Sequence, residues 1–191
     1  MMDALSALHD RVSCPRLVDP APSGEVLENI QKAAFRAADH ARMRPWRFLV
    51  IGGEARNKLG KLFVKAQLVL GEESKGEELT DKQIERITSK PLRAPMIIVA
   101  IASIKKNPKV PEIEQIISAG ATAQNMITAA YAQGVGAIWR TGDVAYDQTV
   151  MDGLGLTKNE KIVGFLYLGT VPVDGLEAPE MEVNDYFQSW P

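Results

Sequence analysis

Four short apolar segments, each rich in β-branched or other large apolar residues, are the feature that most restricts how this chain can fold. They occupy residues 48–51, 96–101, 135–139 and 162–168. Runs of this length are typical of strands that are buried in a sheet. Helical patterns lie between them, but helices and strands do not alternate strictly. We therefore predict a mixed β-sheet layered with helices.

Helical periodicity fills the longer intervals between these segments. Apolar residues recur three and four apart over residues 25–39 and 58–70, and lysines occupy the opposite face of the second stretch. A longer helix with many small residues is predicted over 112–133, where another backbone can approach closely. Gly134 is well placed as its left-handed stop. A short helix is predicted over 147–154.

Residues 71–90 interrupt this pattern. Glutamate, aspartate and lysine dominate the segment, and large apolar residues are few. Such a segment buries too little apolar area to offset the entropy lost on ordering. We expect it to form a mobile excursion over the surface.

Composition limits the class of protein. The 191 residues show no linker or repeat and predict one domain spanning 1–191. With 22 basic and 24 acidic residues the net charge is −2, which points to neither a nucleic acid nor an anionic membrane as partner. No run of eighteen apolar residues occurs, and the one cysteine fits a reducing compartment. We expect a cytoplasmic protein with no membrane contact.

Two stretches place a guanidinium and a hydroxyl close together at the end of a predicted element. The first is Arg11-Val12-Ser13, and the second is the sequence from Gly136 to Gly142, which contains Trp139, Arg140 and Thr141. Arginine with a hydroxyl donor is a strong way to hold a phosphate. Neither stretch has a glycine-rich phosphate loop, so the common nucleotide folds are poor explanations. A phosphorylated cofactor would have to be held by side chains.

The C-terminal segment after Pro172 ends in an aromatic cluster of Tyr186, Phe187 and Trp190. These side chains need a surface on which to pack. That surface is either the body of the same chain or a neighbouring subunit, and the sequence alone does not choose.

The order of motifs resembles the nitroreductase family of FMN proteins, and its minimal, YdjA-like branch in particular. The resemblance covers nearly the whole chain. It is carried by five stretches, which are Arg11-x-Ser13, Arg36-Ala37-Ala38-Asp39-His40, Pro45-Trp46-Arg47-Phe48-Leu49-Val50, Gly134-Val135-Gly136-Ala137-Ile138-Trp139-Arg140-Thr141-Gly142 and Glu160-Lys161-Ile162-Val163-Gly164-Phe165-Leu166-Tyr167-Leu168-Gly169.

This resemblance implies a nitroreductase-like α+β fold with a central sheet. It also implies an obligate homodimer with two FMN molecules at the subunit interface. NAD(P)H would give a hydride to the flavin and leave, and a small acceptor such as a nitroaromatic or a quinone would then use the same pocket. The flavin carries the chemistry, so the resemblance implies no catalytic acid, base or nucleophile and no metal site.

The resemblance also assigns site residues. Arg11 and Ser13 would hold the FMN phosphate, with Val12 contributing backbone and apolar surface. Arg36 and His40 would approach the cofactor from the end of the second helix. Trp139, Arg140 and Thr141 would contact the cofactor from the end of the strand. Tyr131, Gln133 and Gly134, at the end of the long helix, would contact the nicotinamide.

Each of these residues has a simpler interpretation. Arg11 and Arg36 could complement helix ends, His40 could close a helix, and Trp139 could be a core residue. A dimeric FMN-binding, sensing or delivery module without turnover is the alternative function. A serine–histidine hydrolase has little support, because the chain has two histidines and no Gly-x-Ser-x-Gly elbow.

Overall fold

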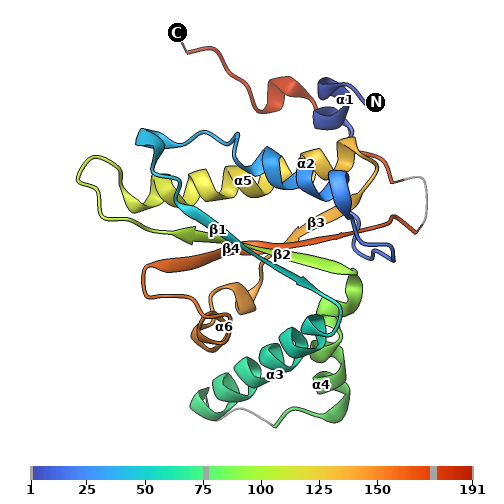
Figure 1. Ribbon diagram of the computed structural model, residues 1–191, viewed down its shortest axis with the longest axis vertical. Coiled ribbons are helices and arrows are strands. Elements are labelled where there is room, and N and C mark those ends of the chain that lie inside the picture. The colour runs from blue at the N-terminus through green and yellow to red at the C-terminus, as the bar shows by residue number, and fades with distance from the viewer. Residues whose placement is uncertain (1, 75–77, 173–175, 191) are drawn as a thin grey trace.

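Four strands form one central sheet in the order β1-β2-β4-β3 (Figure 1). They are β1 (Trp46–Gly52), β2 (Met96–Ser103), β3 (Gly136–Arg140) and β4 (Glu160–Gly169). All four were predicted from the apolar segments. The structure is a computed structural model that describes residues 2–74, 78–172 and 176–190.

Helices cover both faces of the sheet, which confirms the layered α+β architecture. One face carries α2 (Gly24–Ala34) and the long α5 (Glu112–Ala132), and the other carries α3 (Ala55–Ser74), α4 (Asp81–Thr88) and α6 (Gln148–Gly153) (Figure 1). The short α1 (Ala4–His9) packs against α5. Among the described residues, no helix is long and apolar enough to cross a membrane.

Alternating side chains of β2 divide the core into two layers. Ile97, Val99 and Ile101 are buried with the residues of α3 and α6, whereas Ile98 and Ala100 are buried with those of α2 and α5. Successive side chains of a strand point to opposite faces, so a strand covered on both sides must be apolar throughout. This is why the strand appears in the sequence as an uninterrupted apolar run.

Every pair of neighbouring strands among the described residues is antiparallel. The prediction of a mixed sheet, with parallel and antiparallel pairs, is therefore wrong. Gly52 at the end of β1 pairs with Met96 at the start of β2. The helices α3 and α4 run side by side and return the chain to the end of the sheet that it has just left (Figure 1). A parallel pair would require the connection to finish at the opposite end.

The α5 helix stops where the sequence predicts. The backbone of Gly134 is left-handed at φ 75°, and its N–H donates to the carbonyl of Tyr131 at 2.9 Å. A residue without a Cβ adopts this conformation at little cost. The turn sends the chain directly into β3.

The prediction of a mobile excursion over residues 71–90 is wrong for the part of this segment that the structure describes. Helix α4 lies within it and begins with a capping box in which Thr80 and Gln83 bond each other's backbone N–H. Ile87 is buried against α3. Gly60 of α3 lets the two helices meet, because a Cβ there would stand 2.2 Å from the carbonyl oxygen of Thr88. Capping and one apolar face are enough to order a segment that is polar overall. Residues 75–77 lie outside the described residues.

The aromatic cluster of the C-terminal segment is not covered by its own protomer. Tyr186 is 67% exposed, Phe187 76% and Trp190 94%. Figure 1 places this segment beyond the layer of α2 and α5, near the N-terminus. The sequence left two surfaces on which the aromatic cluster could pack. In this structure the cluster does not pack on the first of them, the body of its own chain.

Candidate functional site at the end of strand β3

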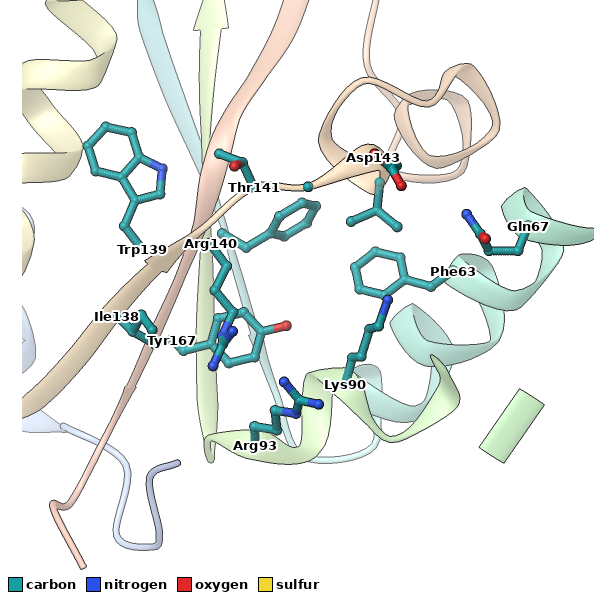
Figure 2. Close-up of a pocket in the computed structure, with 13 residues that line it drawn as sticks. Phe63, Gln67, Lys90, Arg93, Ile138, Trp139, Arg140, Thr141, Asp143 and Tyr167 are labelled. Carbon is teal, nitrogen blue, oxygen red and sulfur yellow. The ribbon is translucent and has the colours of Figure 1, made fainter. Parts of the chain in front are cut away.

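A cavity of about 460 Å³ lies beside the end of β3, on the sheet face that α3 covers. We call it the β3 cavity. Phe63 of α3, with Phe165 and Tyr167 of β4, supplies its aromatic surface. Polar lining comes from η2 (Lys90–Arg93) and from the turn after β3, which carries Thr141 and Asp143 (Figure 2).

Arg140 reaches this cavity from β3 and lies over the ring of Tyr167, with 5.5 Å between the guanidinium carbon and the ring centroid. Its Nη2 donates to the carbonyl of Pro15 at 3.0 Å. Its Nε is buried and has no hydrogen-bond partner among the described residues. The guanidinium is therefore oriented by aromatic and backbone contacts and retains an unused donor.

Burial raises the pKa of Tyr167 to about 12, although the positive charges of Arg140 and Arg93 oppose the shift. Desolvation disfavours the phenolate, and here it outweighs two nearby cations. The phenol thus stays protonated at neutral pH. It can donate a hydrogen bond into the cavity.

Trp139 belongs to the opposite face of β3. Figure 2 shows its indole directed away from Arg140, and its Nε1 donates to the carbonyl of Val163 at 3.3 Å. The indole fits only because residue 164 is glycine, since a Cβ there would stand 2.0 Å from Nε1. In the protomer the indole packs against the core of the α2 and α5 layer, and Trp139 is also among the residues that line the β3 cavity. Its contact with a cofactor stays a prediction.

The N-terminal segment runs along the free edge of β3. The N–H of Cys14 donates to the carbonyl of Ala137 at 3.0 Å, and the N–H of Leu17 donates to that of Arg93 at 2.8 Å. A second cavity of about 420 Å³, here called the N-terminal cavity, opens between this segment and Arg140. Arg93 and Arg140 line both cavities, so the two lie next to each other.

The residues of the Arg11-Val12-Ser13 motif immediately precede this segment. The Nη1 of Arg11 is buried and has no hydrogen-bond partner among the described residues. Val12 is partly buried and Ser13 is exposed. The segment that follows the first motif thus lies against β3, but Arg11, Val12 and Ser13 themselves line neither the β3 cavity nor the N-terminal cavity. That the two motifs form one site stays a prediction.

Arg36 and His40 lie in the other layer. Arg36 follows α2 and is exposed, and the Nδ1 of His40 contacts the carboxylate of Glu114 on α5. Neither residue lines the β3 cavity or the N-terminal cavity. A single protomer therefore does not unite all the predicted cofactor residues.

Tyr131, Gln133 and Gly134 form the end of α5, away from both cavities. The amide of Gln133 donates to the carbonyls of Val26 and Ala129 and accepts from Asn29, which ties α5 to α2. These bonds give Gln133 a structural role. Contact of the three residues with a nicotinamide stays a prediction.

Lys90 and Arg93 are cavity residues that sequence reasoning missed. They are the first and last residues of the short η2 turn before β2. Lys90 ends the stretch that was predicted to be mobile, and Arg93 follows it. A possible signal was the pair of cations just ahead of a buried strand. Their proximity to Arg140 depends on strand order, which the sequence does not state.

The cavity residues are positively charged overall. Lys90, Arg93 and Arg140 face one carboxylate, that of Asp143. None of these four takes part in an ion pair within the described parts of the chain. An aromatic surface beside uncompensated cations suits a planar ligand that carries negative charge.

Comparison with known proteins agrees with this geometry. The model of the nitroreductase family matches residues 8–170. YdjA of Escherichia coli (strain K12), a provisional NAD(P)H nitroreductase by name, is 44% identical over 169 residues, which make up 88% of this chain and 88% of YdjA.

Solved structures share the fold. A nitroreductase-like family protein from Bacillus cereus superposes with a TM-score of 0.82 at 21% identity, covering 100% of this chain and 97% of the other. A provisional nitroreductase from Desulfovibrio desulfuricans, solved in complex with FMN, gives a TM-score of 0.74 at 22% identity and covers 100% and 98%.

Proposed function

This chain belongs to the nitroreductase family, and on that premise we propose that it is an FMN-dependent oxidoreductase. It would take a hydride from NAD(P)H and pass it to a small acceptor, such as a nitroaromatic or a quinone, by a ping-pong route. The name of YdjA and the FMN in the Desulfovibrio desulfuricans structure support this proposal.

The observation that carries the proposal is the pair of unused buried guanidinium donors, Arg11 Nη1 and Arg140 Nε. A buried donor without a partner costs about 1 to 3 kcal/mol, so such atoms are rare unless a ligand satisfies them. The phosphate and ribityl oxygens of FMN are acceptors of the right kind. Arg11 and the Ser13 hydroxyl would hold the phosphate, and Arg140 would contact the remainder of the cofactor.

We propose that the flavin ring binds in the β3 cavity. Phe165 and Tyr167 offer apolar surface, and Lys90 and Arg93 offer positive charge that would stabilise a reduced, anionic ring. When bound, FMN would supply the hydride chemistry. The protein residues then need only orient the ring, exclude water and hold the charge, so no acid, base or nucleophile is required.

A homodimer would complete the site. Arg36 and His40 of one protomer lie away from its own β3 cavity, and we propose that they reach the flavin of the partner. Apolar side chains exposed on α1 and α5 support such an interface. Leu5 is 63% exposed, Leu8 61% and Ile117 63%, and the aromatic C-terminal segment lies on the same side (Figure 1). Exposed apolar surface of this kind is typical of a subunit interface.

Anaerobic mixing of the FMN-loaded protein with NADH or NADPH tests the function. We expect a yellow protein whose absorbance near 450 nm is bleached on the order of seconds, as for typical enzyme turnover, and returns when a quinone is added. A yellow protein that neither nicotinamide bleaches would support the storage or sensing module instead. A protein that stays colourless with excess FMN would contradict both functions. Light scattering of the same sample tests the dimer.

A further inference from the structure

A third cavity, of about 650 Å³, lies on the loop that joins α2 to β1. We call it the loop cavity. Three of its lining residues are arginines, namely Arg36, Arg42 and Arg44, and all three are exposed. Within the described residues, none of the three guanidiniums forms an ion pair or a hydrogen bond. Three like charges therefore line one space, and none of the three guanidiniums is paired.

The loop holds two of these arginines, Arg42 and Arg44, in an unusual backbone conformation. Ala41, Arg42 and Arg44 are all left-handed, with φ of 56°, 55° and 47°. Each such residue costs of order 1 kcal/mol or more and persists only where the surroundings hold it. Here the N–H of Arg44 donates to Asp39 Oδ2 at 2.8 Å, and Lys105 Nζ donates to the carbonyl of Arg44 at 3.2 Å. These bonds fix the backbone of Arg44, from which its exposed guanidinium extends.

The local charge balance favours an anion. Asp39 is the only carboxylate among the described residues that line the loop cavity, so the three arginines leave an excess of two positive charges. Its Oδ2 is used by the Arg44 backbone, and its Oδ1 is buried without a hydrogen-bond partner. Asp39 therefore bonds the loop backbone and none of the guanidiniums, and its charge lowers the excess from three to two.

Aromatic side chains stand beside the charges. Phe35, which is 59% exposed, and Trp46 both line the loop cavity. A ring carrying a carboxylate could stack on these faces while the guanidiniums bind its oxygens, often through two parallel hydrogen bonds. The cavity thus combines the two contacts that an aromatic acid requires.

We propose that Arg42 and Arg44 select electron acceptors that carry an anionic group on an aromatic ring. This rests on the proposed function, in which Arg36 from the same cavity reaches the flavin of the partner protomer. The loop cavity would then adjoin the place where the acceptor meets the flavin. The phosphates of the nicotinamide donor offer the same anionic chemistry, and the experiment separates the two sources.

The experiment compares two acceptors of nearly equal size with the FMN-loaded homodimer. We expect kcat/KM for 4-nitrobenzoate to exceed that for nitrobenzene, and R42Q and R44Q each to lower the 4-nitrobenzoate value roughly tenfold, as for loss of a hydrogen bond to a charged group. The nitrobenzene value should stay within about twofold, since uncharged contacts remain. R44K should recover part of the loss, because it keeps the charge without the fork geometry.

Binding provides a readout that does not depend on turnover. Benzoate cannot accept the hydride, and calorimetric titration of the oxidised protein should give a Kd that rises roughly tenfold in R42Q and R44Q. K58Q is the matched control, because Lys58 is exposed on α3 in the opposite layer and its loss also removes one positive charge. K58Q should leave both the kcat/KM for 4-nitrobenzoate and the Kd for benzoate unchanged.

Three outcomes would overturn the inference. One is an equal loss for both acceptors, and another is unchanged benzoate binding in R42Q and R44Q. The third is that R42Q and R44Q change only the ratio of kcat/KM for NADPH to that for NADH. This result would mean that the arginines bind the nicotinamide donor and not the acceptor. If NAD(P)H fails to bleach the bound FMN, the proposed function itself fails, whereas normal bleaching with no acceptor discrimination refutes only the role of Arg42 and Arg44.

Discussion

Arg47 and Glu160 join two strands that are not neighbours in the sheet. Arg47 Nε lies 2.6 Å from Glu160 Oε1, and Arg47 Nη2 lies 2.8 Å from Oε2. Because β2 separates β1 from β4, the two side chains span an intervening strand. The contact with Arg47 lowers the pKa of Glu160 from 4.5 to about 2, and the N–H of Thr157 adds to the shift.

This pair predicts acid-sensitive stability. A carboxylate whose folded-state pKa is depressed stabilises the fold fully above its unfolded pKa, and the contribution is lost as the pH falls through the folded value. For Glu160 the window runs from about 4.5 down to about 2. We expect Glu160→Gln to lower the free energy of unfolding by about 2 to 3 kcal/mol at pH 7 and to flatten the pH dependence in this window.

Glu112→Gln is the control for this measurement. Glu112 and Lys161 form an ion pair in which both side chains are about half exposed, and such surface pairs contribute less than about 1 kcal/mol. Urea unfolding of the three proteins at pH 7 and pH 4 measures the difference. Equal losses in Glu160→Gln and Glu112→Gln would show that the buried pair has no special role.

Arg11→Ala should weaken retention of FMN. Loss of a charge-assisted contact to the phosphate predicts a cost of about 1.5 to 3 kcal/mol in binding free energy, or roughly a 10- to 150-fold rise in Kd. Equilibrium dialysis against FMN measures this change. Lys65→Ala on the exposed face of α3 removes the same charge and should not alter the Kd. If both variants retain flavin like the parent, Arg11 does not hold the phosphate.

Lys90→Met should make the bound flavin harder to reduce. A cation beside the ring favours the anionic reduced form, so its removal should lower the two-electron midpoint potential, by about 30 mV if the contact is worth about 1.4 kcal/mol. Anaerobic redox titration against a reference dye measures the potential. Lys61→Met, on the outer side of α3, is the comparison. An unchanged potential in Lys90→Met would assign charge stabilisation to another residue.

Gly164→Ala should displace the indole of Trp139. The new methyl group would stand 2.0 Å from Nε1, and overpacking of this kind costs about 1 to 3 kcal/mol of stability. Gly120→Ala faces the same indole at 3.7 Å, an ordinary contact, and replaces glycine inside α5, so it should be neutral or stabilising. Thermal unfolding and tryptophan fluorescence of both variants check this. A stable Gly164→Ala protein with unchanged fluorescence would contradict the structure at this point.

The positions of the regular elements could be predicted because their signals are local. The segment 96–101 is apolar at every position, and it became most of β2, whose residues 97–102 are buried. Gly134 could be assigned to the end of α5 because a left-handed stop depends on one residue. The segment 71–90 was predicted wrongly because its average composition hid a local signal, the spacing of Thr80 and Gln83 that caps α4.

The site was only partly predictable. The N-terminal segment that follows Arg11 runs along β3, where the carbonyl of Pro15 accepts from Arg140, and the family-like motifs pointed to both arginines. Lys90 and Arg93 were missed because nothing in their own neighbourhood in the sequence indicates that η2 faces the end of β3.

The sequence by itself determined the four strands, the main helices and the family, since periodicity, capping and motifs are written in residues that are close along the chain. Only the tertiary structure decided that the sheet is antiparallel, that η2 cations meet Arg140, and that Arg36 and His40 lie in another layer. The physical reason is that strand order and helix placement follow from burying both faces of the sheet at once, and this free energy depends on contacts between residues that are far apart in sequence.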